Sequence, residues 1–143
     1  MILYNIEGKP EVKNNESFSD VNKDMWYSDA ISFLKDNKII NGLLDGTYHP
    51  DDELTCEELI TILYNYSKFK NNDLKINEDT NFLSYNDFMD ISDWANTPML
   101  WALDNKIIIG TDDNNINPKE NLSRSRVATI ITRFCENINI IKK

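Results

Sequence analysis

The chain repeats itself at a spacing of 68 residues. The segment from Asp36 to Gly42 returns, with one change, as Asp104 to Gly110. Single residues then recur in the same register: Asp45, Pro50, Leu54, Thr61 and Ile62 return as Asp113, Pro118, Leu122, Thr129 and Ile130. A period this long indicates one folded unit used twice. Repeats of a small unit typically form scaffolds and binding surfaces, so the pattern favours a binding protein over an enzyme.

The repeat extends upstream and leaves a trace at the start of the chain. Phe18-Ser19-Asp20-Val21 pairs with Phe88-Met89-Asp90-Ile91, and Trp26 pairs with Trp94, with two fewer residues between these points in the second copy. Ile2 to Asn5 is the same tetrapeptide as Ile62 to Asn65. We therefore predict the tail of a preceding repeat and a linker at 1–17, a repeat at 18–69, a linker at 70–87 and a repeat at 88–143.

Composition narrows the function classes. The chain has 143 residues, of which 41% are hydrophobic, and this suits one compact domain or two packed units. Its net charge of −9 argues against general nucleic-acid binding, which uses a basic surface. No apolar stretch reaches the roughly 20 residues that cross a bilayer, so we expect no membrane insertion. No signal peptide is visible in this sequence.

Each copy is predicted to fold as helix, loop, helix, which makes the chain all-α. In the first copy, Trp26, Ala30 and Leu34 share one helical face. Thr55, followed three residues later by Glu58, forms a capping box that opens the second helix.

The second copy follows the same plan. Ser123 is its matching helix cap, and Pro98 fits only in the first turn of its first helix.

Sites for catalysis or metal binding are not indicated. The two cysteines, Cys56 and Cys135, sit at non-equivalent positions, and His49 is the single histidine, so a zinc site is not predicted. The acidic loops lack the spacing of a calcium-binding EF-hand. No nucleophile elbow or phosphate-binding loop is present. We expect no enzyme, no metal and no cofactor, although carboxylate pairs leave a hydrolase fragment as a weaker alternative.

An ordered set of motifs resembles a known family. The set comprises Phe18-Ser19-Asp20-Val21, Trp26, Asn41-Gly42, the run from Asp45 to Pro50, and the run from Leu54 to Glu58. Together they resemble the S-layer homology repeat, and the resemblance covers most of the chain.

The resemblance implies a fold, a location and a partner. Such repeats usually come in threes as a pseudo-threefold helical bundle, which would be incomplete here. They belong to exported bacterial proteins and hold them non-covalently to anionic secondary cell-wall polysaccharides, often through a pyruvylated sugar. The resemblance thus implies two partners, a cell-wall polysaccharide and the rest of a larger exported protein. It implies a cell-surface location, with the signal peptide outside this sequence.

The family's ligand-contacting arginine maps unequally onto the two copies. Cys56 stands at that position in the first copy and Arg124 in the second. Arg124 and Arg126 fall in the first turn of a helix, where each cation costs about 0.3–1 kcal/mol against the helix dipole. A carboxylate on a sugar, bound by backbone N–H groups and guanidinium groups, would offset this cost. The alternative is that Arg126 pairs with Glu120 or another nearby acid and Arg124 is solvated.

Two tryptophans and two aspartates are further candidates for ligand binding. Trp26 and Trp94 could stack on a sugar ring, but a tryptophan on an apolar helical stripe more often lies in the core, and we predict mainly core positions. Asp20 and Asp90 could accept a hydrogen bond from a sugar hydroxyl, but capping of the helix or turn that follows is the preferred interpretation.

Gly42 and Gly110 complete the candidate set. Each is predicted to mark a positive φ or a close backbone approach. If their amides face a groove, they would also contact ligand.

A second functional hypothesis stays open. In it, the copies are degenerate repeats that serve packing or protein–protein assembly without binding sugar. Cys56 in place of arginine supports it, and so does the missing repeat, through which the chain could self-associate.

Overall fold

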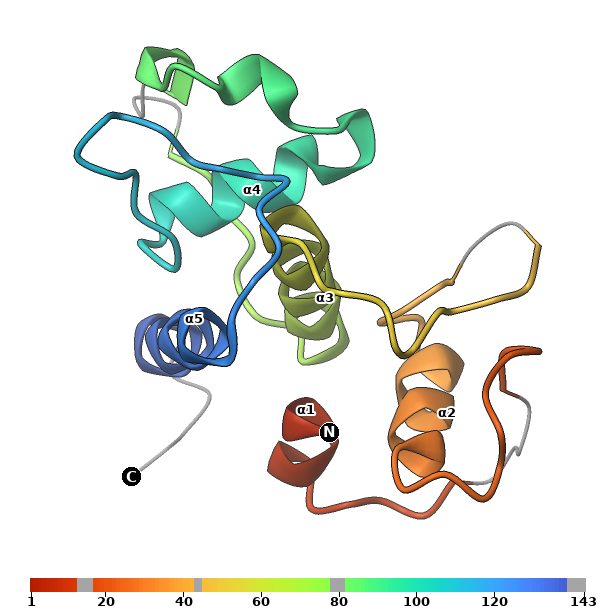
Figure 1. Cartoon of the computed structure of the whole chain (residues 1–143). Coiled ribbons are helices and arrows are strands. Elements are labelled where there is room, and N and C mark those ends of the chain that lie inside the picture. The colour runs from red at the N-terminus through yellow and green to blue at the C-terminus, as the bar shows by residue number, and fades with distance from the viewer. Residues whose placement is uncertain (13–16, 43–44, 78–81, 139–143) are drawn as a thin grey trace. The chain divides into compact units, whose positions relative to one another are not determined.

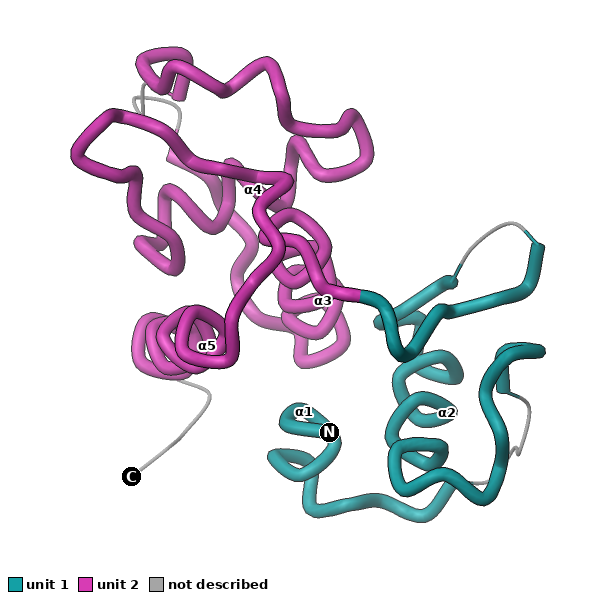
Figure 2. The backbone as a smooth tube through the Cα atoms, in the orientation of Figure 1, with its two compact units in different colours: residues 1–52 teal, residues 53–143 magenta. Residues whose placement is uncertain are grey.

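The computed structural model describes residues 1–12, 17–42, 45–77 and 82–138. The remaining residues fall in the predicted 1–17, 18–69, 70–87 and 88–143 segments, and what we predict for them lies outside the described residues. The chain forms two compact units, residues 1–52 and 53–143, which are coloured separately in Figure 2.

The first unit contains two helices, α1 (Ile2–Ile6) and α2 (Ser28–Asp36), which pack together (Figure 1). The ring of Tyr4 in α1 lies 5.7 Å from that of Phe33 in α2. The Tyr4 hydroxyl donates to the carbonyl of Pro10, so a buried tyrosine keeps a partner for its polar end.

The helix α2 begins later than the sequence pattern predicts. Ser28 is its first residue, and the Ser28 hydroxyl donates to the carbonyl of Lys23, closing a turn before the helix. Trp26 therefore lies ahead of the helix and is 73% exposed, which makes the predicted core position wrong. Ala30 and Leu34 are buried as predicted.

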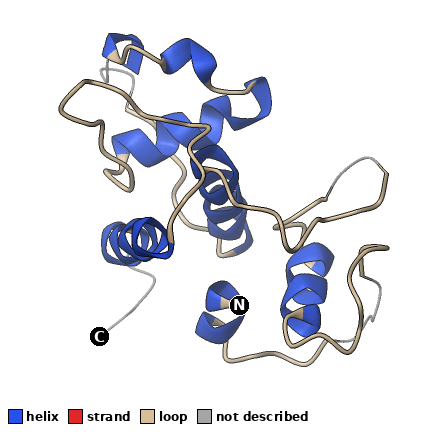
Figure 3. Ribbon diagram, viewed as in Figure 1, coloured by secondary structure: helices blue, strands red, loops and turns tan. Residues whose placement is uncertain are grey.

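The second unit is also helical. It contains α3 (Cys56–Phe69), three short 3₁₀ helices, α4 (Asn96–Asp104) and α5 (Arg124–Asn137) (Figure 3). The 3₁₀ helices are η1 (Phe82–Ser84), η2 (Phe88–Asp90) and η3 (Asp93–Ala95). Among the described residues the only β-type pairing is an isolated bridge between Thr55 and Asn121. The predicted all-α class is confirmed.

Local sequence signals explain where the long helices begin. The Thr55 side chain accepts from the Glu58 N–H, and the Glu58 carboxylate accepts from the Thr55 N–H, which is the predicted capping box. The Ser123 side chain accepts from the Arg126 N–H at the start of α5. Pro98 sits in the first turn of α4, where its missing N–H removes no helical hydrogen bond.

Three aromatic side chains from three helices form the centre of the second unit. The ring of Phe134 in α5 lies 6.1 Å from that of Tyr66 in α3 and 6.2 Å from that of Trp101 in α4. All three are fully buried. Both cysteines, Cys56 and Cys135, are buried and form no disulfide.

None of the described helices has both the length and the apolar character that a bilayer crossing requires.

Candidate functional site

An aspartate anchors the loop of the first repeat. The two carboxylate oxygens of Asp20 accept from the backbone N–H groups of Tyr48 (2.8 Å) and His49 (2.7 Å). The N–H of Ser19 donates to the Gly46 carbonyl. Desolvation acts to raise the pKa of Asp20, but the two backbone hydrogen bonds outweigh it and hold that pKa below its ordinary value.

The second repeat builds the same anchor from Asp87. Its carboxylate oxygens accept from the N–H groups of Ile116 and Asn117, both at 2.8 Å. The N–H of Asn86 donates to the Asn114 carbonyl, as Ser19 does to Gly46. Tyr48 and Ile116 are 68 residues apart, and so are Gly46 and Asn114, so the loops match in the repeat register.

These bonds correct the upstream alignment. Asp87, not Asp90, takes the place of Asp20, and the segment Tyr85-Asn86-Asp87 corresponds to Phe18-Ser19-Asp20. The second copy is therefore one residue longer before its tryptophan, not two residues shorter. The signal in the sequence is an aromatic residue two positions before an aspartate, displaced by one residue from the 68-residue register.

The two candidate glycines occupy equivalent positions in the two repeats, but a side chain is excluded at each for a different steric reason. Gly42 has a φ of +67°, and a Cβ there would meet the ring of Phe18 and the Thr47 carbonyl, the latter at 2.6 Å. At Gly110 a Cβ would meet the ring of Tyr85. Both fit the prediction of a positive φ or a close approach, and both show the same aromatic side chain packed on a glycine.

The helix caps predicted at Asp20 and Asp90 do not form. The helices α2 and α4 have no hydrogen bond from a capping side chain. Asp20 anchors a loop 28 residues away, so for Asp20 the preferred helix-capping interpretation is wrong. Asp90 ends η2 and is exposed.

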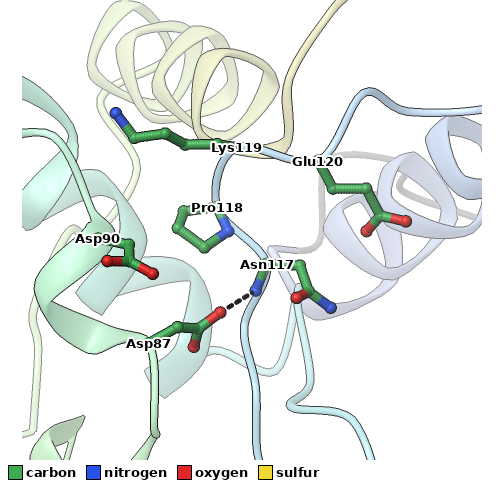
Figure 4. Close-up of a pocket in the computed structure, with 6 residues that line it drawn as sticks. All are labelled: Asp87, Asp90, Asn117, Pro118, Lys119 and Glu120. Atoms are coloured by element: carbon green, nitrogen blue, oxygen red, sulfur yellow. Dashed lines mark hydrogen bonds between the residues drawn. The ribbon is translucent and has the colours of Figure 1, made fainter.

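A polar pocket of about 680 Å³ lies in the second unit (Figure 4). Its two walls are the region of η2 and the segment that leads to α5. The lining residues are Asp87, Asp90, Asn117, Pro118, Lys119 and Glu120. Asp87 is engaged with the backbone, whereas the side chains of Asp90, Asn117 and Glu120 make no hydrogen bond among the described residues. The pocket thus offers two carboxylates and one amide for hydrogen bonding to hydroxyl groups.

A buried glutamate supports one side of this pocket. Glu57, in the first turn of α3, is 4% exposed, and its carboxylate accepts from the N–H (3.0 Å) and the hydroxyl (2.8 Å) of Ser92. The Lys119 ammonium lies 3.9 Å from the same carboxylate and donates to the Ser92 hydroxyl at 3.1 Å. No local pattern in the sequence marks this group of three residues, because its contacts span 27 to 62 positions.

Backbone hydrogen bonds join the first turn of α3 to the segment 118–122. The N–H groups of Cys56 and Glu57 donate to the carbonyls of Glu120 (3.0 Å) and Pro118 (2.8 Å). The Leu122 N–H donates to the Leu54 carbonyl at 2.8 Å. We call this set of three bonds the repeat seam.

The family's arginine position differs in its environment between the two repeats. Cys56 is 1% exposed, and burial raises the pKa of its thiol to about 11, although nearby Arg126 acts to lower it. The thiol is therefore neutral and supplies no cation. Arg124 is exposed and Arg126 half-buried, and neither lies within 4 Å of an acidic group among the described residues, Glu120 included.

Both candidate tryptophans are on the surface. Trp94 lies in η3, before α4, and is 57% exposed, so its predicted core position is wrong for the same reason as that of Trp26. The buried tryptophan is Trp101. An exposed indole offers an apolar face for stacking.

No cluster of three or more metal-binding side chains of the types His, Cys, Asp and Glu occurs within the described ranges.

Comparison with known proteins agrees with this geometry. Residues 17–60 and 84–125 match the S-layer homology domain. The chain belongs to the S-layer homology domain family. The two matches begin one residue before Phe18 and one before Tyr85, which is the register given by Asp20 and Asp87.

The similar curated proteins are much longer than this chain. The chain is 26% identical to the Surface-layer 125 kDa protein of Lysinibacillus sphaericus over 136 residues, which are 93% of this chain and 11% of that protein. It is 34% identical over 140 residues to Exoglucanase XynX of Acetivibrio thermocellus, covering 97% of this chain and 12% of the enzyme. It is 26% identical over 121 residues to the Cellulosome-anchoring protein of the same organism, covering 84% and 26%.

The S-layer homology domain is a non-catalytic module, and the relative named as an exoglucanase is matched over only 12% of its length. Membership of the family places the chain among proteins of the bacterial cell surface.

Proposed function

We propose that this chain is a non-catalytic module that anchors a larger exported protein by binding an anionic secondary cell-wall polysaccharide, with a pyruvylated sugar as the preferred ligand. Relatives named as a surface-layer protein and a cellulosome-anchoring protein support an anchoring role. The chain covers only a small part of each, so the cargo belongs to the rest of the protein.

The observation that carries the proposal is the first turn of α5. Arg124 and Arg126 stand where the helix dipole is positive, and neither has an acidic partner within 4 Å among the described residues. An anion bound there would gain two charge-assisted contacts and favourable interaction with the dipole. We assign Arg124 the main contact with an acidic sugar substituent, since Arg126 lies near Cys56.

The remaining candidates that touch the ligand contact the uncharged parts of the sugar in this proposal. Trp94, exposed in the same unit as α5, offers a face for a sugar ring. Asp90 in the pocket offers acceptors for sugar hydroxyls. In the first unit, Trp26 would stack in the same way, while Asp20 is committed to its loop and would act by holding the loop in place. Gly42 and Gly110 are covered by the rings of Phe18 and Tyr85, so in this proposal they act by allowing that packing and not by contacting the ligand.

The test is co-sedimentation of the purified chain with bacterial cell walls, before and after acid removal of their secondary polysaccharide. We expect binding to intact walls and its loss on stripped walls. Arg124→Ala is expected to weaken binding about tenfold or more, as loss of a charge-assisted contact predicts. Arg133→Ala, the same charge change further along α5, is the matched control and should bind normally. Equal binding to intact and stripped walls would contradict the proposal.

A second candidate function is supported by Cys56. A buried, neutral thiol at the arginine position leaves the first repeat without its cation. Degenerate repeats kept for structure or assembly would show this feature. In that case the chain would bind neither intact nor stripped walls, and Arg124→Ala would change nothing.

A further inference from the structure

Each repeat has backbone groups at the positions of the repeat seam that form no seam bond within the part of the chain that the structure describes. We call these two sets of groups, in the segment 50–54 and at the start of α5, the unused ends of the seam. In the seam, Leu54 contributes its carbonyl and Leu122 its N–H. Among the described residues, the N–H of Leu54 and the carbonyl of Leu122 have no backbone hydrogen bond. One repeat therefore presents the donor and the other presents the acceptor of the same bond, 68 residues apart.

The other two seam bonds show the same complementarity. Arg124 and Ser125 occupy the positions of Cys56 and Glu57, and within the described part of the chain their N–H groups make no backbone hydrogen bond. The acceptors in the seam, Glu120 and Pro118, correspond to Asp52 and Pro50, and no N–H in the described ranges donates to these carbonyls. The segment 50–54 thus offers carbonyl acceptors of the kind that the N–H groups in the first turn of α5 are without.

The charged side chains also support a contact between the segment 50–54 and the first turn of α5. In the seam, the first turn of α3 carries Glu57, and the opposing segment carries Lys119, with 3.9 Å between the charged groups. At the unused ends the signs are exchanged. The first turn of α5 carries two arginines, and the segment 50–54 carries Asp51, Asp52 and Glu53, all exposed.

We propose that the first turn of α5 binds the segment 50–54 of a second copy of this chain, and so repeats the seam between molecules. The N–H groups of Arg124 and Ser125 donate to the carbonyls of Asp52 and Pro50 of the second copy. The N–H of that copy's Leu54 donates to the Leu122 carbonyl. The acidic side chains of the segment face the two arginines.

Such a contact is head-to-tail. One copy contributes the first turn of α5 and its neighbour contributes the segment 50–54. Every copy therefore keeps one free surface for a further copy, and the association can continue into rings or open chains. The proposal goes beyond wall binding, and it is measured on the purified chain without polysaccharide. Both proposals use Arg124 and Arg126, so the polysaccharide and the second copy would compete for the first turn of α5. Sedimentation without polysaccharide and binding to cell walls are separate measurements, so a failure of self-association is distinguished from a failure of wall binding.

The experiment is sedimentation velocity over a range of protein concentrations with charge-exchanged variants. The double variant Arg124→Glu/Arg126→Glu should lose self-association, and so should Asp51→Lys/Glu53→Lys, each by roughly tenfold or more because attraction becomes repulsion. A one-to-one mixture of the two should associate again, because glutamates then face lysines. Raising the salt concentration should weaken the association of the unchanged chain.

A matched control tests whether total charge is responsible. Asp112→Lys/Asp113→Lys makes the same charge change in an exposed loop outside the segment and should associate like the unchanged chain. Circular dichroism of each variant checks that the helices are retained. A monomer at all concentrations for the unchanged chain overturns the proposal, and so does a mixture of variants that remains monomeric while both are folded.

Discussion

The first turns of α3 and α5 share a backbone plan and differ in charge. Both begin with a hydroxyl side chain that caps the helix, and Thr55 and Ser123 accept from the N–H three residues on. The turn of α3 then carries two glutamates, one in a capping box and one buried against Ser92. The turn of α5 carries two arginines without an acidic partner among the described residues. The acids of the α3 turn have partners within the chain, whereas the arginines of the α5 turn bind an anion from outside in both of our proposals.

The largest difference between the repeats is expected at the paired glycines. Gly42→Ala forces a side chain into a positive φ and against both a ring and a backbone carbonyl, and we expect a loss of about 3 kcal/mol. Gly110→Ala meets only the ring of Tyr85, which can turn away, and should lose about 1–2 kcal/mol. Urea unfolding of both variants measures this. Equal losses would mean that the two glycines serve the same constraint.

The next effect concerns the position that follows the arginine site. Glu57→Ala leaves the N–H and hydroxyl of the half-buried Ser92 without their acceptor, and we expect a loss of about 2 kcal/mol. Ser125→Ala, at the equivalent place in α5, removes an exposed hydroxyl and should stay within about 0.5 kcal/mol. Thermal unfolding at low protein concentration compares the two. A large loss for Ser125→Ala would show that its turn is already engaged within the chain.

Exchanging the charges at the third residue of α3 and of α5 should change stability by smaller amounts and in opposite directions. Arg126→Glu gives α5 a capping box and an acid near the positive end of the helix, so stability should rise by about 0.5–1 kcal/mol. Glu58→Arg removes the capping box from α3 and should lower stability by a similar or greater amount. Destabilisation by Arg126→Glu, measured by urea unfolding, would show that the arginine has a stabilising role inside the folded chain.

The smallest expected effect is a pH dependence in the loop of the first repeat. The pKa of Asp20 is lowered in the folded state, so its contribution is present above the ordinary aspartate pKa of about 4 and is lost as the pH falls through the lower, folded value. Asp20→Asn should flatten the fall in stability between about pH 5 and pH 3. Asp51→Asn is the control, since its side chain accepts no backbone hydrogen bond among the described residues. Identical acid profiles for the unchanged chain and Asp20→Asn would rule out this role.

Local signals in the sequence are enough to predict much of the fold. The 68-residue repeat, the capping box at Thr55 and Glu58, and the cap at Ser123 all depend on residues close together in the chain or in a fixed register, and the structure confirms them. The two glycines are likewise recognisable, because a glycine beside a turn typically marks a positive φ or a close backbone approach.

The candidate site is harder to predict. Sequence similarity pairs Asp20 with Asp90 and places Asp87 in a linker. The backbone hydrogen bonds show instead that Asp87 is the equivalent of Asp20. Trp26 and Trp94 continue an apolar stripe, yet they precede their helices and so do not share the helical face. In each case a shift of a few residues at the start of an element decides which way a side chain points.

The sequence by itself determined the repeat, the helical class and the family, because periodicity and capping are properties of neighbouring residues. Only the tertiary structure decided which aspartate anchors the second loop and that Glu57 is buried against Ser92. It also decided which backbone groups of the segment 50–54 and of the first turn of α5 have no backbone partner among the described residues. These features depend on hydrogen bonds between residues about 30 to 70 positions apart. Such bonds form only when the folded backbone brings those residues together, and no local pattern encodes them.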